Sequence, residues 1–144
     1  MAQAAVIKGG IFSDERGSLS FVNDFTFPGV KRFYQIVHPD TSIVRAWQGH
    51  KVEQKYFYVP KGKFVLAWVE IDDWNKPSAD LKAEYVILKE DEPAVLSIPP
   101  GYANGIKALE PGSVLMVYSD LDLQQSGEDR WSFDASLWLD WNKI

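Results

Sequence analysis

Residues 55–71, KYFYVPKGKFVLAWVEI, decide the fold class of this chain. Two apolar runs flank Pro60-Lys61-Gly62, and the second contains Phe64–Val69, the longest uninterrupted apolar stretch in the sequence. Proline and glycine in a short polar connection predict a tight turn. Short runs rich in aromatic and β-branched residues predict strands. Residues 55–71 therefore predict two strands joined by a turn.

The same pattern continues on both sides of this stretch. Apolar and polar residues alternate with the period of a strand in segment after segment, and no stretch has the spacing of an amphipathic helix. The predicted strands are 4–8, 19–27, 32–37, 42–47, 55–59, 63–71, 83–89, 94–98, 105–108 and 114–119. This all-β pattern is typical of a sandwich or of a jelly roll, whose mouth can hold a ligand.

The composition of the chain bears on its domain number, its compartment and its possible partners. A chain of 144 residues, 46% of them apolar, predicts a single domain over residues 1–144. The absence of Cys excludes disulfides and thiolate metal sites, so we expect a cytoplasmic protein. The net charge of -5 has the wrong sign for a nucleic-acid partner, and no apolar run approaches the ~20 residues of a membrane span.

The last residues of the chain are unusually apolar. They include Trp131, Phe133, Leu137, Trp138, Leu139 and Trp141. Because so much aromatic surface is unfavourable in water, we expect this segment to dock on the domain.

Chemistry concentrates between Arg45 and Lys55, where cations surround His50. Strand alternation places Arg45 on the face of Trp47, and an inward-facing Arg needs an anionic partner. It also places Gln48 and His50 on one shared face. The alternative is structural, with Arg45 paired to Glu53 or Asp72 and His50 in a surface turn. The second histidine, His38, precedes Pro39, and we expect it at a surface loop.

A metal site is a further alternative. Jelly-roll proteins of the cupin type place metal ligands at H-x-H-x(3,4)-E and P-x-G-x-x-H. In this chain the amides of Gln48 and Asn104 replace two of the three histidines, leaving His50 and Glu53. Amides bind first-row metals more weakly than imidazole does. We therefore expect no metal and no other cofactor.

Several motifs in order resemble one enzyme family. They are Phe12–Gly17, Val44–Trp47, Gln54-Lys55, Ile98–Gly105, Val117–Ser119 and the Trp-rich tail. Their order is similar to that in dTDP-4-dehydrorhamnose 3,5-epimerases. Lys31–Tyr34, followed by Arg45–Gln54, also resembles the cupin sugar 3,4-ketoisomerases, whose motif in the second stretch is R-G-x-H-A-H-K-x-x-E-Q. The resemblance implies a homodimeric, metal-free jelly roll that acts on a dTDP-linked 4-keto-6-deoxyhexose.

The resemblance also implies roles for individual residues. His50 would be the base, because Gln48 stands where the epimerases have theirs. Lys55 would stabilise the enolate oxygen, and Arg16 would bind the diphosphate across the dimer. The remaining substrate-binding candidates are Arg45, Gln48, Asn104 and Tyr118.

The proton donor of the epimerases has no counterpart in this sequence. Leu123 and Gln124 occupy its position, which leaves Tyr34 and Tyr102 as substitutes. The expected reaction is epimerisation next to the ketone. The alternatives are 3,4-ketoisomerisation and a sugar-nucleotide-binding cupin without catalysis.

Overall fold

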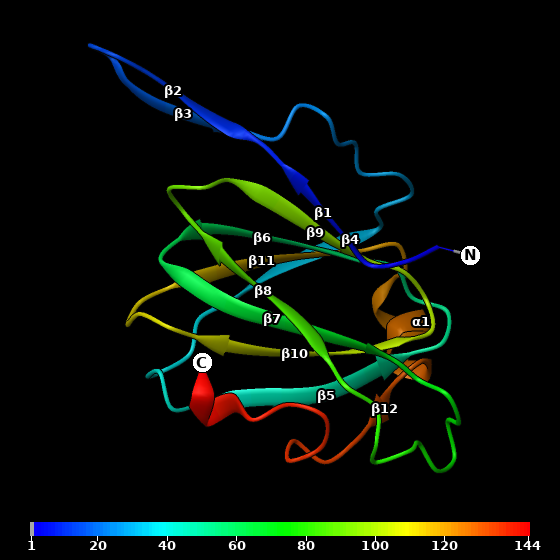
Figure 1. Ribbon diagram of the computed structural model, residues 1–144. Coiled ribbons are helices and arrows are strands. Elements are labelled where there is room, and N and C mark those ends of the chain that lie inside the picture. The colour runs from blue at the N-terminus through cyan, green and yellow to red at the C-terminus, as the bar shows by residue number, and fades with distance from the viewer. Residues whose placement is uncertain (1) are drawn as a thin grey trace.

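The computed structural model describes residues 2–144 as two facing antiparallel sheets with a hairpin projecting from them (Figure 1). The first sheet has the order β1 (Ala5–Lys8), β9 (Ala94–Ile98), β6 (Lys55–Lys61), β11 (Val114–Ser119) and β4 (Arg32–Ile36). The second has the order β12 (Trp131–Ser132), β5 (Val44–His50), β10 (Tyr102–Ala108), β7 (Lys63–Glu70) and β8 (Glu84–Lys89). The hairpin consists of β2 (Gly10–Asp14) and β3 (Gly17–Phe21), and α1 (Leu123–Glu128) and a 3₁₀ turn, η1 (Trp141–Lys143), complete the chain. The expected all-β, cupin-type jelly roll is confirmed.

The main core lies between the two sheets. Alternate residues of the facing strands supply it, as the period of two predicts. Its fully buried side chains include Phe64 and Leu66 from β7, Leu96 from β9 and Leu115 from β11.

A second core covers the outer face of the second sheet. The C-terminal segment runs back along β5 (Figure 1). Its Trp141 and Trp138 pack on Trp47. A Cβ atom at Gly105 would stand 2.6 Å from the Trp141 ring, so only glycine permits this close approach. The predicted docking of the tail is confirmed.

A bulge in β5 decides which side chains face the interior. Asn104 pairs with Gln48 and Ile106 with Arg45, so one residue of β10 lies opposite two of β5. Such a bulge shifts the alternation by one residue. The prediction that Arg45 and Trp47 share a face was therefore wrong: Trp47 lies in the second core, and Arg45 faces a cavity with Gln48.

Some predicted strand boundaries differ from the structure. The strand predicted over 19–27 ends at Phe21, and Phe25 and Phe27 instead pack their rings on Tyr56 and Tyr118 outside the first sheet. The strand predicted over 42–47 continues to His50. No helix within residues 2–144 is long and apolar enough to cross a membrane.

Candidate functional site

A cavity of about 470 Å³ lies between β4 and β5, beside α1. Its polar wall contains Gln48 and His50 together with four cationic side chains, Arg32, Arg45, Lys55 and Arg130. Tyr34 and Phe33 contribute aromatic surface from β4, and α1 contributes Leu123, Ser126 and Gly127. Four cations in one concave site favour an anionic ligand.

His50 occupies the floor of this cavity and is only 5% exposed. Its Nδ1 atom lies 2.8 Å from the backbone carbonyl oxygen of Asp129 and 3.1 Å from Oε1 of Glu53. Its Nε2 atom is buried without a hydrogen-bond partner among residues 2–144. The alternative of a surface-turn histidine is therefore wrong.

Glu53 is a buried carboxylate with dedicated donors. Ser126 donates its hydroxyl to Glu53 at 3.0 Å from Oε2, and Ser119 donates to the same oxygen. Arg32 Nη2 lies 4.0 Å from that oxygen. The Glu53 side chain therefore faces His50 and two serines. The alternative in which Glu53 pairs with Arg45 is wrong.

Asp129 fixes the turn that follows His50. Its carboxylate accepts hydrogen bonds from the backbone N–H groups of Lys51, Val52 and Glu53 at 2.8 to 2.9 Å. Because its carbonyl oxygen also faces His50, this residue holds both the ring and the turn.

The environment of His50 favours the neutral ring. Burial lowers the pKa of His50 below its usual value of 6.5, and the nearby Lys55 ammonium acts in the same direction. Glu53 and Asp129 partly offset this effect. A neutral imidazole at pH 7 is able to accept a proton.

Lys55 and Tyr34 belong to the part of the wall contributed by the first sheet. Lys55 Nζ donates a hydrogen bond to the Tyr34 hydroxyl at 3.3 Å. The Arg32 guanidinium lies 4.8 Å from the centre of the Tyr34 ring. Tyr34 and His50 thus approach the cavity from different sheets, which is the arrangement that two-sided proton transfer needs.

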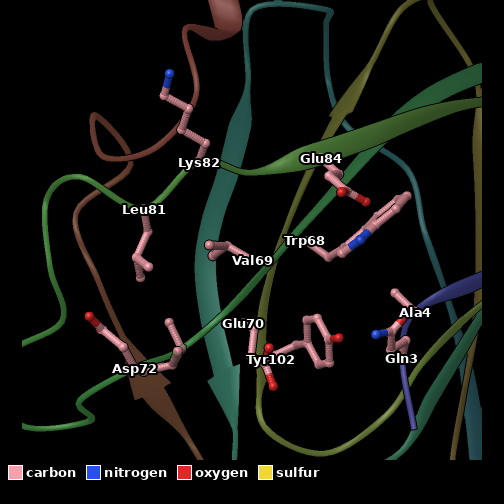
Figure 2. A pocket seen from close by; sticks show the side chains of 11 residues that line it. Gln3, Ala4, Trp68, Val69, Glu70, Asp72, Leu81, Lys82, Glu84 and Tyr102 are labelled. Carbon is pink, nitrogen blue, oxygen red and sulfur yellow. The ribbon is translucent and has the colours of Figure 1, made fainter. Parts of the chain in front are cut away.

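Asn104 and Tyr102 lie on β10, one strand away from His50. Asn104 is buried directly opposite Gln48. Tyr102 pairs with His50 in register, but its side chain lines a different cavity of about 600 Å³, beside Glu70 (Figure 2). Burial and the Glu70 charge raise the pKa of Tyr102.

That larger cavity is less suited to an anion. Its lining includes the carboxylates of Glu70, Asp72 and Glu84, with Lys82 as its cation (Figure 2). Because like charges repel, a diphosphate fits the cation-rich cavity beside α1 better.

Besides Asn104, two predicted substrate-binding residues, Tyr118 and Arg16, are not among the residues that line the cation-rich cavity. Tyr118 packs against Phe27 and Phe33 on the outer face of the first sheet. Arg16 lies at the tip of the projecting hairpin, where its Nη2 atom is 2.7 Å from the Asp14 carboxylate.

His38 is not at the surface as expected. It is buried, with its ring 5.7 Å from that of Phe64. Burial lowers the pKa of His38, with the Arg45 charge as a smaller cause.

The described residues also bring three potential metal-binding side chains together. Ligand atoms of His50, Glu53 and Asp129 lie within 4.8 Å of one another. The Asp129 carbonyl accepts a hydrogen bond only from a protonated Nδ1, which has no lone pair for a metal. The two carboxylates already accept hydrogen bonds from serines and backbone N–H groups. This donor set fits a hydrogen-bonded network better than a metal centre.

Sequence reasoning missed the residues contributed by α1 and its C-terminal end. Asp122 and Gln125 form a capping box, the D-x-x-Q signal that identifies the start of this helix. The capping box is followed in the chain by Ser126, Asp129 and Arg130. Nothing in the spacing of these residues indicates that they lie near His50.

Comparison with known proteins places the fold. No protein-family model and no curated protein matches the sequence. Solved structures do: the Mycobacterium tuberculosis rmlC epimerase superimposes with a TM-score of 0.78 at 19% identity, over 96% of this chain and 74% of that one. The chain has the fold of the dTDP-sugar epimerases and ketoisomerases.

Two further structures support this assignment. The dTDP-4-dehydrorhamnose 3,5-epimerase from Sulfolobus tokodaii has a TM-score of 0.77 at 26% identity, over 96% of this chain and 80% of that one. QdtA, a sugar 3,4-ketoisomerase from Thermoanaerobacterium thermosaccharolyticum in complex with TDP, has a TM-score of 0.67 at 22% identity, over 88% and 86%. The suspected resemblance to these enzymes is thus confirmed.

Proposed function

We propose that the chain is an isomerase that moves a proton next to the ketone of a nucleotide-linked 4-keto-6-deoxyhexose. One observation carries the proposal: the imidazole of His50 is buried, with its pKa lowered by that burial, and it lines a cavity rich in cations. The family resemblance supplies the substrate class, with dTDP as the expected nucleotide. The same class of reaction belongs to deoxysugar and surface-polysaccharide synthesis.

The proposed reaction begins when His50 removes the proton on the carbon next to the ketone. The electron pair of the broken C–H bond forms an enolate. Lys55, beside the cavity, supplies a positive charge for the enolate oxygen, a form of electrostatic stabilisation worth ~10²–10³ in rate. Arg45 binds the diphosphate, for which a guanidinium fork is well suited.

Inversion requires a second group to return a proton to the opposite face. Tyr34 meets this requirement because it comes from the facing sheet and its hydroxyl receives a hydrogen bond from Lys55. Transfer of the phenolic proton to the enolate carbon would leave a phenolate beside the Lys55 ammonium. His50 would then lose its new proton to solvent, and the Tyr34 phenolate would regain a proton from solvent, which restores both groups.

A specific observation favours 3,4-ketoisomerisation as the second candidate. The only histidine in the cavity is at the second histidine position of the ketoisomerase motif, and Gln48 occupies the first. In that reaction the O3 hydroxyl proton would move to O4 of the enediolate, and the single base would deliver to C4 the proton that it removed from C3, which produces a 3-keto sugar. NMR of the product distinguishes the two: an inverted centre at C3 supports epimerisation, and a ketone at C3 supports isomerisation.

The proposal includes independence from metals. We expect the purified protein to retain its turnover after dialysis against a chelator. Stoichiometric iron or zinc, together with loss of turnover on its removal, would contradict this part. Binding of dTDP without any turnover would instead support the non-catalytic alternative.

The projecting hairpin supports a homodimer. Phe12 and Leu19 on its two strands are 58% and 59% exposed, and an isolated two-stranded hairpin is marginally stable in water. A second copy would cover these side chains and could place Arg16 near its diphosphate. We expect a dimer in sedimentation analysis and a monomer after Phe12→Ser and Leu19→Ser together. A monomeric wild type would refute it.

A further inference from the structure

The segment 126–129 makes three separate contacts with the floor of the cavity. Ser126 donates to the Glu53 carboxylate, the Asp129 carbonyl faces Nδ1 of His50, and the Asp129 carboxylate binds the backbone of 51–53. Supporting contacts of this kind orient a functional side chain and hold it in one geometry.

These contacts determine which nitrogen of His50 carries the proton. A carbonyl oxygen is only an acceptor, so at 2.8 Å it requires a hydrogen on Nδ1. The Glu53 carboxylate, 3.1 Å from the same nitrogen, strengthens that preference. The neutral ring then keeps its lone pair on Nε2, which is the atom left without a partner.

We propose that Glu53 and Asp129 are positioning residues that hold His50 in the tautomer protonated at Nδ1, so that Nε2 is the atom that exchanges protons with the substrate. This inference rests on the proposed function but concerns residues to which the family resemblance assigns no role. When Nε2 accepts a proton, the Glu53 carboxylate faces the new imidazolium. The other charged groups around the ring are Lys55 and, behind Glu53, Arg32.

The tautomer can be measured without substrate. The chain contains two histidines, so a ¹⁵N-labelled sample with His38→Asn gives the signal of His50 alone. Long-range ¹H–¹⁵N correlation at pH 8 should show a protonated Nδ1 and an unprotonated Nε2. A proton on Nε2 would overturn the inference.

The positioning role is tested by exchange kinetics. Glu53→Gln keeps the shape of the side chain but removes the charge, and we expect kcat for solvent exchange to fall on the order of 10²-fold, with KM within about twofold of wild type. Glu128→Gln is the matched control, because it makes the same chemical change at an exposed position at the end of α1. An unchanged kcat in Glu53→Gln would overturn the role.

A second variant guards against misfolding of Glu53→Gln. Ser126→Ala removes one hydrogen bond to the carboxylate, and we expect a fall of about tenfold in kcat, with unfolding still cooperative. A kcat equal to that of the Glu128→Gln control would count against the inference. If wild type shows the Nδ1 tautomer but no exchange with any substrate, the proposed function fails and the tautomer assignment stands.

Discussion

The imidazole Nδ1 atom of His50 lies 2.8 Å from the carbonyl oxygen of Asp129, although 79 positions separate the two residues in the chain. This contact joins the end of β5 to the end of α1, and both elements line the cation-rich cavity. His50 and one wall of the cavity are therefore parts of one connected structure.

The Lys55 ammonium should act mainly in the chemical step. We expect Lys55→Met to lower kcat by ~10²–10³, because the enolate loses its positive neighbour, and to change KM little. Steady-state kinetics with a 4-keto sugar nucleotide checks this. Lys61→Met, at the exposed end of the same strand, is the control. Equal kcat values for the two variants would contradict the role of Lys55.

The Arg45 guanidinium should act mainly in binding. We expect Arg45→Ala to weaken dTDP binding about tenfold in calorimetry, the effect of one charge-assisted hydrogen bond. Lys76→Ala removes a cation from an exposed loop and should leave the affinity unchanged. A wild-type affinity for Arg45→Ala would show that the diphosphate lies elsewhere.

The rate of solvent exchange should fall as the pH is lowered. The base must be neutral, and burial and Lys55 lower the pKa of His50 below 6.5. The exchange rate should thus be constant above about pH 6.5 and fall only as the pH drops through the lowered pKa. A pH–rate profile from pH 5 to pH 8 tests this, and a midpoint above 6.5 would be inconsistent with the buried ring.

The docked tail should contribute to stability as well as to the shape of the second sheet. Trp141 is buried against Trp47, and Trp141→Ala should lower the free energy of unfolding by about 3–5 kcal/mol. Urea unfolding measures the change. Val52→Ala, at an exposed position, should cost far less. A similar small loss in both variants would mean that the tail packs loosely.

Much of the fold could be predicted from the sequence, because strand alternation and turn residues are local signals. The alternation of residues 55–71 and the apolar tail both led to correct expectations. The bulge in β5 could not be predicted, because it depends on the pairing of β5 with β10 and on Trp47 reaching the second core. That single shift is what brings Arg45 to the face of Gln48.

The candidate site was predicted only in part. His50, Gln48, Arg45, Lys55 and Tyr34 lie within one short region of sequence or match a family motif, and all of them line the cavity. Ser126 and Asp129 come from a helix of six residues, too short for a hydrophobic pattern. Their contacts with Glu53 and His50 depend on tertiary packing alone.

Solvent deuterium exchange tests the central claim most directly. The protein is incubated in D₂O with dTDP-4-keto-6-deoxyglucose, and deuterium at C3 is followed by NMR beside His50→Asn. We predict catalytic incorporation by the wild-type protein and none above background in the variant. Equal incorporation by both proteins, or none by the wild type with any 4-keto sugar nucleotide, would contradict the account.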